Sequence, residues 1–175
     1  MKSIEFKNKH QKDSIKKACD YKSISLRENM IDFPDYIFEN TFQTNFLNRV
    51  FLEQINNDDI DIYKLFNSEI NRKINSYINQ DIQKGLINNN LLNKDDLLEK
   101  IIISKLRCNF CNNKVKLFYK EVRDKKQWTL DRIDNNLPHT ITNVSICCLE
   151  CNIKRRNRNY DKFLFSKQIK LEKIK

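Results

Sequence analysis

Four of the six cysteines in the chain stand in two pairs with the spacing of metal ligands. Cys108 and Cys111 form one Cys-x-x-Cys pair, and Cys148 and Cys151 form the other. The two-residue gap lets both sulfurs of a pair reach one ion, and four thiolates suit tetrahedral zinc with Zn–S bonds of about 2.3 Å. Four cysteine ligands leave no position for water, so we expect a structural zinc site. Buried free thiols or a redox pair are the alternatives.

Positive charge is concentrated in the C-terminal part of the chain. Residues 1–99 carry 14 Lys and Arg against 16 Asp and Glu, whereas residues 100–175 carry 19 against 7. A region this basic is typical of proteins that bind polyanions, because each neutralised phosphate releases condensed counterions. A well-solvated basic surface is the alternative interpretation.

The segment between the cysteine pairs has the pattern of a hairpin followed by a helix. Residues 127–134 are rich in aromatic and β-branched types, which favour a strand, and residues 135–138 have turn chemistry. A second strand is expected over 143–148, with Cys147 and Cys148 on opposite faces and Cys147 as a small core residue. From Leu149 onward the chain has no helix breaker, which predicts a basic helix. Its cations are Lys154, Arg155, Arg156 and Arg158.

The N-terminal part is predicted to be helical. Apolar residues at four-residue spacing begin behind Thr41, a candidate N-cap, and a longer stripe runs from Ile62 to Ile78. Residues 95–102 read as a short amphipathic helix with acids in its first turn. We therefore predict an α+β protein, in which residues 1–100 form a helical support of unknown role and residues 101–175 a zinc-stapled module. We interpret Trp128 as a core residue, and Phe163 and Phe165 as anchors of the C-terminal tail.

The composition argues against a membrane or secreted protein. No apolar run approaches the roughly 18 residues that span a bilayer, and the N-terminus lacks the apolar segment of a signal peptide. We expect an intracellular, cytoplasmic protein, or a nuclear one in a eukaryotic host.

Several short motifs follow one another in the predicted hairpin and helix. They are Trp-Thr-Leu-Asp-Arg-Ile-Asp-Asn at 128–135, His139-Thr140, Asn143-Val144, Cys148-Leu149-Glu150-Cys151-Asn152 and Lys154. In order, spacing and flanking cysteine pairs, this stretch resembles the ββα-metal motif of HNH endonucleases. It is most similar to the zinc-bearing branch with Asp-Arg-Ile-Asp, whose members are common in phages and large DNA viruses. The resemblance covers about residues 105–160.

The resemblance implies a metal-dependent endonuclease that hydrolyses phosphodiester bonds in DNA. By the family's pattern, Asp131 is the first ligand of a catalytic Mg²⁺ or Mn²⁺, Asn143 pins the loop, and Asn152 completes the metal site from the helix. Carboxylate and amide oxygens are ligands that such hard ions prefer. The bound ion would stabilise charge on the scissile phosphate.

The chain departs from that pattern at the general base. Arg132 stands where the family usually has histidine, and an arginine stays protonated, so Arg132 can clamp a phosphate but cannot accept a proton. His139 either folds back over the site as the base or is a solvent-exposed loop residue. Asp134 is another candidate base, and turn formation is its alternative. A degenerate module that binds DNA or RNA without cleavage is therefore the alternative function, and a zinc-bearing interaction module is a third.

The basic helix is the predicted nucleic-acid contact. Asn152 and Arg156 are spaced i, i+4, so a metal ligand and a cation would share one helix face. Arg155, Lys154 and Arg158 would reach the backbone of the same strand, unless they form a solvated basic face. A double-strand break would need two protomers, as in a homodimer, or two sequential nicks.

Overall fold

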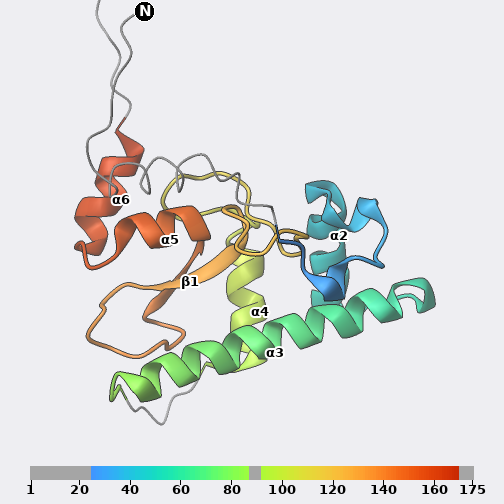
Figure 1. Ribbon diagram of the computed structural model, residues 1–175, viewed down its shortest axis with the longest axis horizontal. Coiled ribbons are helices and arrows are strands. Elements are labelled where there is room, and N and C mark those ends of the chain that lie inside the picture. Colours follow the sequence, from blue (N-terminus) through green and yellow to red (C-terminus); the bar gives the residue numbers. More distant parts are fainter. Residues whose placement is uncertain (1–24, 87–91, 170–175) are drawn as a thin grey trace, which may run out of the picture.

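The computed structural model describes residues 25–86 and 92–169; the rest of the predicted N-terminal support, at 1–24 and 87–91, lies outside the described residues, as does 170–175. The fold is α+β, with helices around a two-stranded antiparallel sheet (Figure 1). The elements in chain order are α2 (Asn40–Phe51), α3 (Ile60–Gln83), α4 (Lys94–Ile103), β1 (Trp128–Arg132), β2 (Val144–Cys148), α5 (Leu149–Arg155) and α6 (Tyr160–Gln168). Single-turn 3-10 helices occupy Glu28–Met30, Asp35–Phe38 and Asn57–Asp59.

The predicted helices of the N-terminal part are present, with one correction at a terminus. The apolar stripe of α3 faces the core through Phe66, Ile70 and Ile74. The N-cap of α4 is Asn93, whose side chain accepts a hydrogen bond from a backbone N–H in the first turn. Thr41 is not the N-cap of α2, because the helix begins at Asn40 and its N-cap residue makes no side-chain hydrogen bond.

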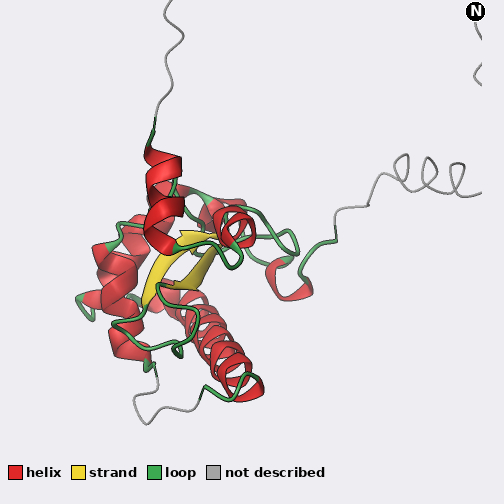
Figure 2. Cartoon of the chain, turned by 90° about the vertical axis from the view of Figure 1, so that its left-hand side faces the viewer, coloured by secondary structure: helices red, strands yellow, loops and turns green. Residues whose placement is uncertain are grey.

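The hairpin is the structural centre of the molecule. β1 pairs with β2 in the register Trp128↔Cys148 to Arg132↔Val144, and all ten strand residues are buried. Helix α5 lies on one side of the sheet and the long α3 on the other, and a second view has the strands enclosed by helices (Figures 1 and 2). Two side chains of α3 bond to the backbone of β1: Tyr77 accepts from Leu130 N at 2.8 Å, and Lys73 donates to Trp128 O. These bonds satisfy polar groups on a strand edge that would otherwise be buried unpaired.

The basic helix is shorter than expected from its sequence. Helix α5 ends at Arg155, and Arg156 takes φ 52° and ψ −120°, a backbone conformation that side-chain-bearing residues rarely adopt. A separate helix, α6, starts after its N-cap Asn159, whose side chain accepts from Lys162 N. The predicted continuous helix through Arg158 is therefore wrong: the chain turns at Arg156.

One apolar core runs through both parts of the chain, from Met30 to Phe163. Phe46 of α2 packs against Phe118, with ring centroids 5.6 Å apart. The buried Gln43 side chain donates to Phe118 O and accepts from Leu117 N, so an α2 residue fixes the backbone that precedes the hairpin. Trp128 is fully buried, in agreement with its predicted core role.

The tail prediction holds for one of its two aromatic residues. Phe163 is buried against Phe110 at 4.9 Å between ring centroids, but Phe165 is 67% exposed and anchors nothing. Among the described residues, no helix combines the length and apolarity needed to cross a membrane.

Candidate functional site

The four paired cysteines converge at the junction of the hairpin and α5. Cys108 and Cys111 lie in the loop after α4, Cys148 ends β2, and Cys151 lies in the first turn of α5. Their sulfur atoms all lie within 4.8 Å of one another. Tetrahedral zinc with bonds of about 2.3 Å separates its sulfur ligands by about 3.8 Å, and the Sγ atoms of Cys111 and Cys148 are 3.9 Å apart. The cluster could therefore hold a metal ion, and its donor set is that of structural zinc.

The local backbone prepares these thiols for a metal. Asn112 has φ 57°, which tightens the turn between the first pair and the following chain, and Cys151 N donates to Cys148 Sγ at 3.4 Å. A hydrogen bond from Cys148 lowers the pKa of Cys108 to about 5, whereas the same contact raises the pKa of Cys148 and burial raises that of Cys151. Thiolates are the metal-binding form of cysteine. The fifth described cysteine, Cys147, is buried outside the cluster, as predicted.

A solvent-accessible cleft of about 690 Å³ lies between α3, the sheet and α5. It brings together five residues singled out from the sequence, and α3 adds residues to its opposite wall. The sequence-predicted lining residues are Asp131, Arg132, His139, Asn152 and Arg156, and those of α3 are Tyr77, Gln80 and Lys84. Asp134 is absent from this lining; its carboxylate accepts from Asn136 N at 2.9 Å, which is the turn-forming role.

His139 is buried and held by a carboxylate from α3. Its Nδ1 lies 2.8 Å from Asp81 Oδ1, and its backbone N–H donates to Asp81 Oδ2 at 2.7 Å. The Tyr77 ring packs on the imidazole at 4.7 Å between centroids. Burial lowers the pKa of His139 below its ordinary value, although the Asp81 carboxylate acts in the opposite direction. The solvent-exposed alternative for His139 is therefore wrong.

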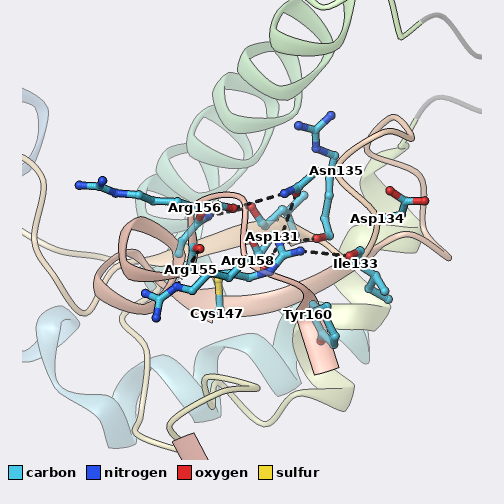
Figure 3. A network of polar contacts seen from close by, with 12 residues as sticks. Asp131, Ile133, Asp134, Asn135, Cys147, Arg155, Arg156, Arg158 and Tyr160 are labelled. Atoms are coloured by element: carbon cyan, nitrogen blue, oxygen red, sulfur yellow. Dashed lines mark hydrogen bonds and ion pairs between the residues drawn. The ribbon is translucent and has the colours of Figure 1, made fainter. Parts of the chain in front are cut away.

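Asp131 forms a buried ion pair with Arg155. The guanidinium Nη1 lies 2.8 Å from Asp131 Oδ2 and also donates to Arg132 O and to the Asn135 side chain, while Nη2 donates to Ile133 O (Figure 3). Arg155 is only 1% exposed. Burial raises the pKa of Asp131, while the Arg155 charge lowers it. The predicted nucleic-acid contact of Arg155 is corrected here: its side chain is buried and its guanidinium donates to the hairpin loop, so it holds this loop and offers no charge at the surface.

The two predicted amide residues have distinct surroundings. Asn143 donates to the carbonyls of Asp134 and Pro138 at 3.0 and 2.9 Å, and its Oδ1 accepts from Asp134 N. It therefore fastens the loop to the start of β2. Asn152 donates to Thr129 Oγ1 and Leu130 O at 3.1 and 3.0 Å, which turns its amide nitrogen toward β1. Within the described chain, Asn152 Oδ1 has no hydrogen-bond donor.

The remaining predicted cations differ in their exposure to solvent and in whether partners within the chain already bind them. Arg132 is buried; it donates to Leu137 O, and its guanidinium lies 3.5 Å from Asp81 Oδ1. Lys154 is exposed and pairs with Glu150. Arg158 is exposed, but its guanidinium donates to the carbonyls of Lys154 and Arg155 at the end of α5. Arg156 is exposed and lines the cleft.

Sequence reasoning missed the contribution of α3 to this cleft. Asp81 falls seven residues after Ile74 and four after Tyr77, so all three share the buried face of one helix. An acid at the end of an apolar stripe was the available signal, because a buried carboxylate needs a partner. The partner, His139, is 58 residues away in sequence.

Comparison of the chain with protein-family models, curated proteins and solved structures finds no match.

Proposed function

We propose that this protein is a metal-dependent endonuclease of HNH type that hydrolyses phosphodiester bonds in DNA. The observation that carries the proposal is the carboxylate-held His139 in the same cleft as Asp131 and Asn152. A histidine with a fixed tautomer beside a carboxylate and an amide oxygen has the chemistry that phosphodiester hydrolysis requires. The cysteine cluster supports it, because a metal bound there would hold the start of α5, which carries Asn152, to the loop after α4.

His139 is the general base in this proposal. Because a carboxylate only accepts hydrogen bonds, Asp81 favours the tautomer with its proton on Nδ1, and Nε2 is left to accept a proton from the attacking water. The lowered pKa keeps the imidazole neutral near pH 7. Arg132 does not replace the family's histidine chemically; it lies against the same carboxylate that holds His139.

Asp131 and Asn152 are the residues that would hold the divalent ion. When bound, this ion supplies charge stabilisation at the scissile phosphate and the leaving oxygen. Arg155 already neutralises part of the Asp131 carboxylate, so we expect weak Mg²⁺ or Mn²⁺ affinity before DNA contributes its own phosphate oxygens. Arg156 and Lys84, which both line the cleft, supply positive charge for the phosphate backbone.

The test is nicking of supercoiled plasmid by the zinc-loaded protein in Mg²⁺ or Mn²⁺. We expect the wild type to nick, and His139→Ala and Asn152→Ala to lose at least about a hundredfold in rate. Asn71→Ala, an exposed amide on α3 outside the cleft, is the matched control and should retain full activity. If only Asn152→Ala loses nicking, the protein is still an endonuclease, but His139 is not its general base.

The buried Arg155–Asp131 ion pair favours a second candidate, a module that binds DNA or RNA without cleavage. A guanidinium 2.8 Å from the carboxylate occupies an oxygen that a nuclease would offer to its metal. Mn²⁺ binding followed by electron paramagnetic resonance, in wild type and Asp131→Asn, separates the candidates. A zinc-loaded wild type that binds DNA, takes up no Mn²⁺ and leaves plasmid intact would identify the non-cleaving module.

A further inference from the structure

A second pocket, of about 380 Å³, lies beside the cleft on α3 and is lined by four cationic residues. These are Arg27, Arg72, Lys73 and Arg123, and no acidic residue is part of the lining. We call it the basic pocket. It lies between α3 and the segment that leads into β1, and none of its four cations lines the cleft.

The positive charge of the basic pocket is incompletely neutralised. Arg27 and Arg72 share one carboxylate, Glu69, at 2.6 and 2.9 Å. Lys73 is 6% exposed; its ammonium lies 4.1 Å from the Trp128 ring centroid, and no carboxylate in the described residues pairs with it. Burial lowers the pKa of Lys73 to about 7, as expected for a buried cation without a counter-ion.

Two further features leave hydrogen-bond donors available for an anion. Arg27 Nη1 is buried and has no hydrogen-bond partner among residues 25–86 and 92–169, although the Nη2 atom of the same side chain binds Glu69. Arg123 is exposed and makes no ion pair within the described residues. A phosphate group would satisfy these donors, since arginine presents a planar fork that matches phosphate oxygens.

The basic pocket is continuous with the cleft. Tyr77, Gln80, Thr129 and Leu149 line both. From Lys73 to Asp81 the α3 axis advances about 12 Å at about 1.5 Å per residue. That length exceeds the separation of neighbouring phosphates on one strand, so a single strand could reach both the basic pocket and the cleft.

We propose that the basic pocket binds a backbone phosphate of the DNA strand whose scissile phosphate lies in the cleft, a few nucleotides away. This inference rests on the proposed function, because it gives the substrate strand a path along α3. It assigns Arg27, Arg72, Lys73 and Arg123 to strand binding and not to chemistry. It also gives the N-terminal part of the chain a direct role in substrate recognition.

The experiment is a salt titration of DNA affinity. Fluorescence anisotropy of a labelled 30-base-pair duplex would be measured with zinc-loaded protein, without Mg²⁺ or Mn²⁺, at several NaCl concentrations. We expect Arg72→Ala/Arg123→Ala to weaken binding and to reduce the slope of log K against log salt by up to about 1, because one neutralised phosphate contributes about 0.9. Lys162→Ala/Lys167→Ala, which removes the same charge from exposed positions on α6, is the control and should change the slope less.

Lys73→Met is a second variant for the same measurement, because its apolar side chain fills similar space without a buried charge. The variant also loses the hydrogen bond from Lys73 to Trp128 O, so its thermal unfolding is measured alongside. In the folded variant we expect a loss of up to about one unit of slope. A wild type with salt-dependent binding whose slope and affinity are unchanged in these variants would overturn the basic pocket alone. A wild type with no salt-dependent DNA binding would overturn the proposed function, and the pocket's assignment with it.

Discussion

At the residue scale, the candidate site depends on pairs of side chains that neutralise one another inside the protein. Asp81 fixes His139, and Arg155 fixes Asp131. Each pair fastens part of the loop between β1 and β2, because His139 lies within that loop and Arg155 also binds its first carbonyls. The same contacts that shape the cleft therefore also set the proton affinity of its ionisable groups.

Asp81→Asn tests whether Asp81 positions a base. The amide can still accept a hydrogen bond from His139, but the negative charge that raises the histidine pKa is gone. We expect nicking to fall by about one to two orders of magnitude. The pH at which activity is lost on acidification should move lower, because His139 then protonates at lower pH. A pH–rate profile measures both effects; an unchanged profile with slower nicking would reduce Asp81 to a structural role.

Arg156 combines a cleft position with a strained backbone. Glycine adopts φ 52° and ψ −120° far more readily than arginine or alanine does. We expect Arg156→Gly to raise the free energy of unfolding by about 1 kcal/mol or more and Arg156→Ala to leave it unchanged or lower. Both variants should weaken DNA binding because both lose the charge. Chemical denaturation and anisotropy measure the two quantities, and equal stability of the Gly and Ala variants would contradict the strain argument.

At the element scale, the hairpin and α5 are too short to hold their geometry alone. Strands of five residues and a helix of seven bury little apolar surface, and a single hairpin is marginally stable in water. A metal ion held by the cysteine cluster would tie the end of β2 and the start of α5 to the loop after α4. The bonds from Lys73 and Tyr77 tie β1 to α3.

Cys151→Ser and Cys147→Ala form a matched pair for the metal centre. Cys151→Ser removes a cluster sulfur, so we expect loss of bound zinc and of the cooperative thermal transition. Cys147→Ala removes a neighbouring buried thiol outside the cluster, and should retain one zinc per chain and lose about 1 kcal/mol. Metal content by atomic absorption and thermal unfolding by circular dichroism measure these outcomes. If zinc chelation leaves the thermal transition of the wild type unchanged, metal binding by the cluster does not stabilise the fold.

At the scale of the whole molecule, the N-terminal part does more than support the rest. Its helices share one core with the C-terminal part, and α3 forms a wall of the cleft. Lys73 and Asp81 lie on the same helix. The basic pocket and the hydrogen bond between Asp81 and His139 are therefore fixed relative to each other by a single rigid element.

Residues 101–175 expressed alone should therefore fail to fold stably, even with zinc. Removal of α2 and α3 would expose Phe118 and Trp128, each worth about 1.5–3 kcal/mol or more of burial. It would also remove Asp81, so the buried His139 would lose the carboxylate to which its backbone N–H and its ring bind. Circular dichroism and thermal unfolding of the zinc-loaded fragment, with the full chain as control, provide the measurement. A cooperative transition at the full chain's temperature would contradict this dependence.

The sequence by itself determined the local features, because these depend on spacing along the chain. The cysteine pairs predicted the cluster, and the period of four predicted α3. Aromatic and β-branched residues predicted the first strand, and the alternation of faces after the turn predicted the second. The early end of α5 escaped prediction because no breaker residue marks Arg156; a strained backbone, held by surrounding contacts, turns the chain there.

Only the tertiary structure decided which charges meet. Arg155 and Arg156 are adjacent and chemically identical, yet one is buried on Asp131 and the other is exposed in the cleft. Asp81 finds His139 across 58 residues, and Lys73 lies over Trp128 across 55. Burial and pairing of charges depend on which elements pack together, and packing joins segments whose separation in sequence carries no signal of their contact.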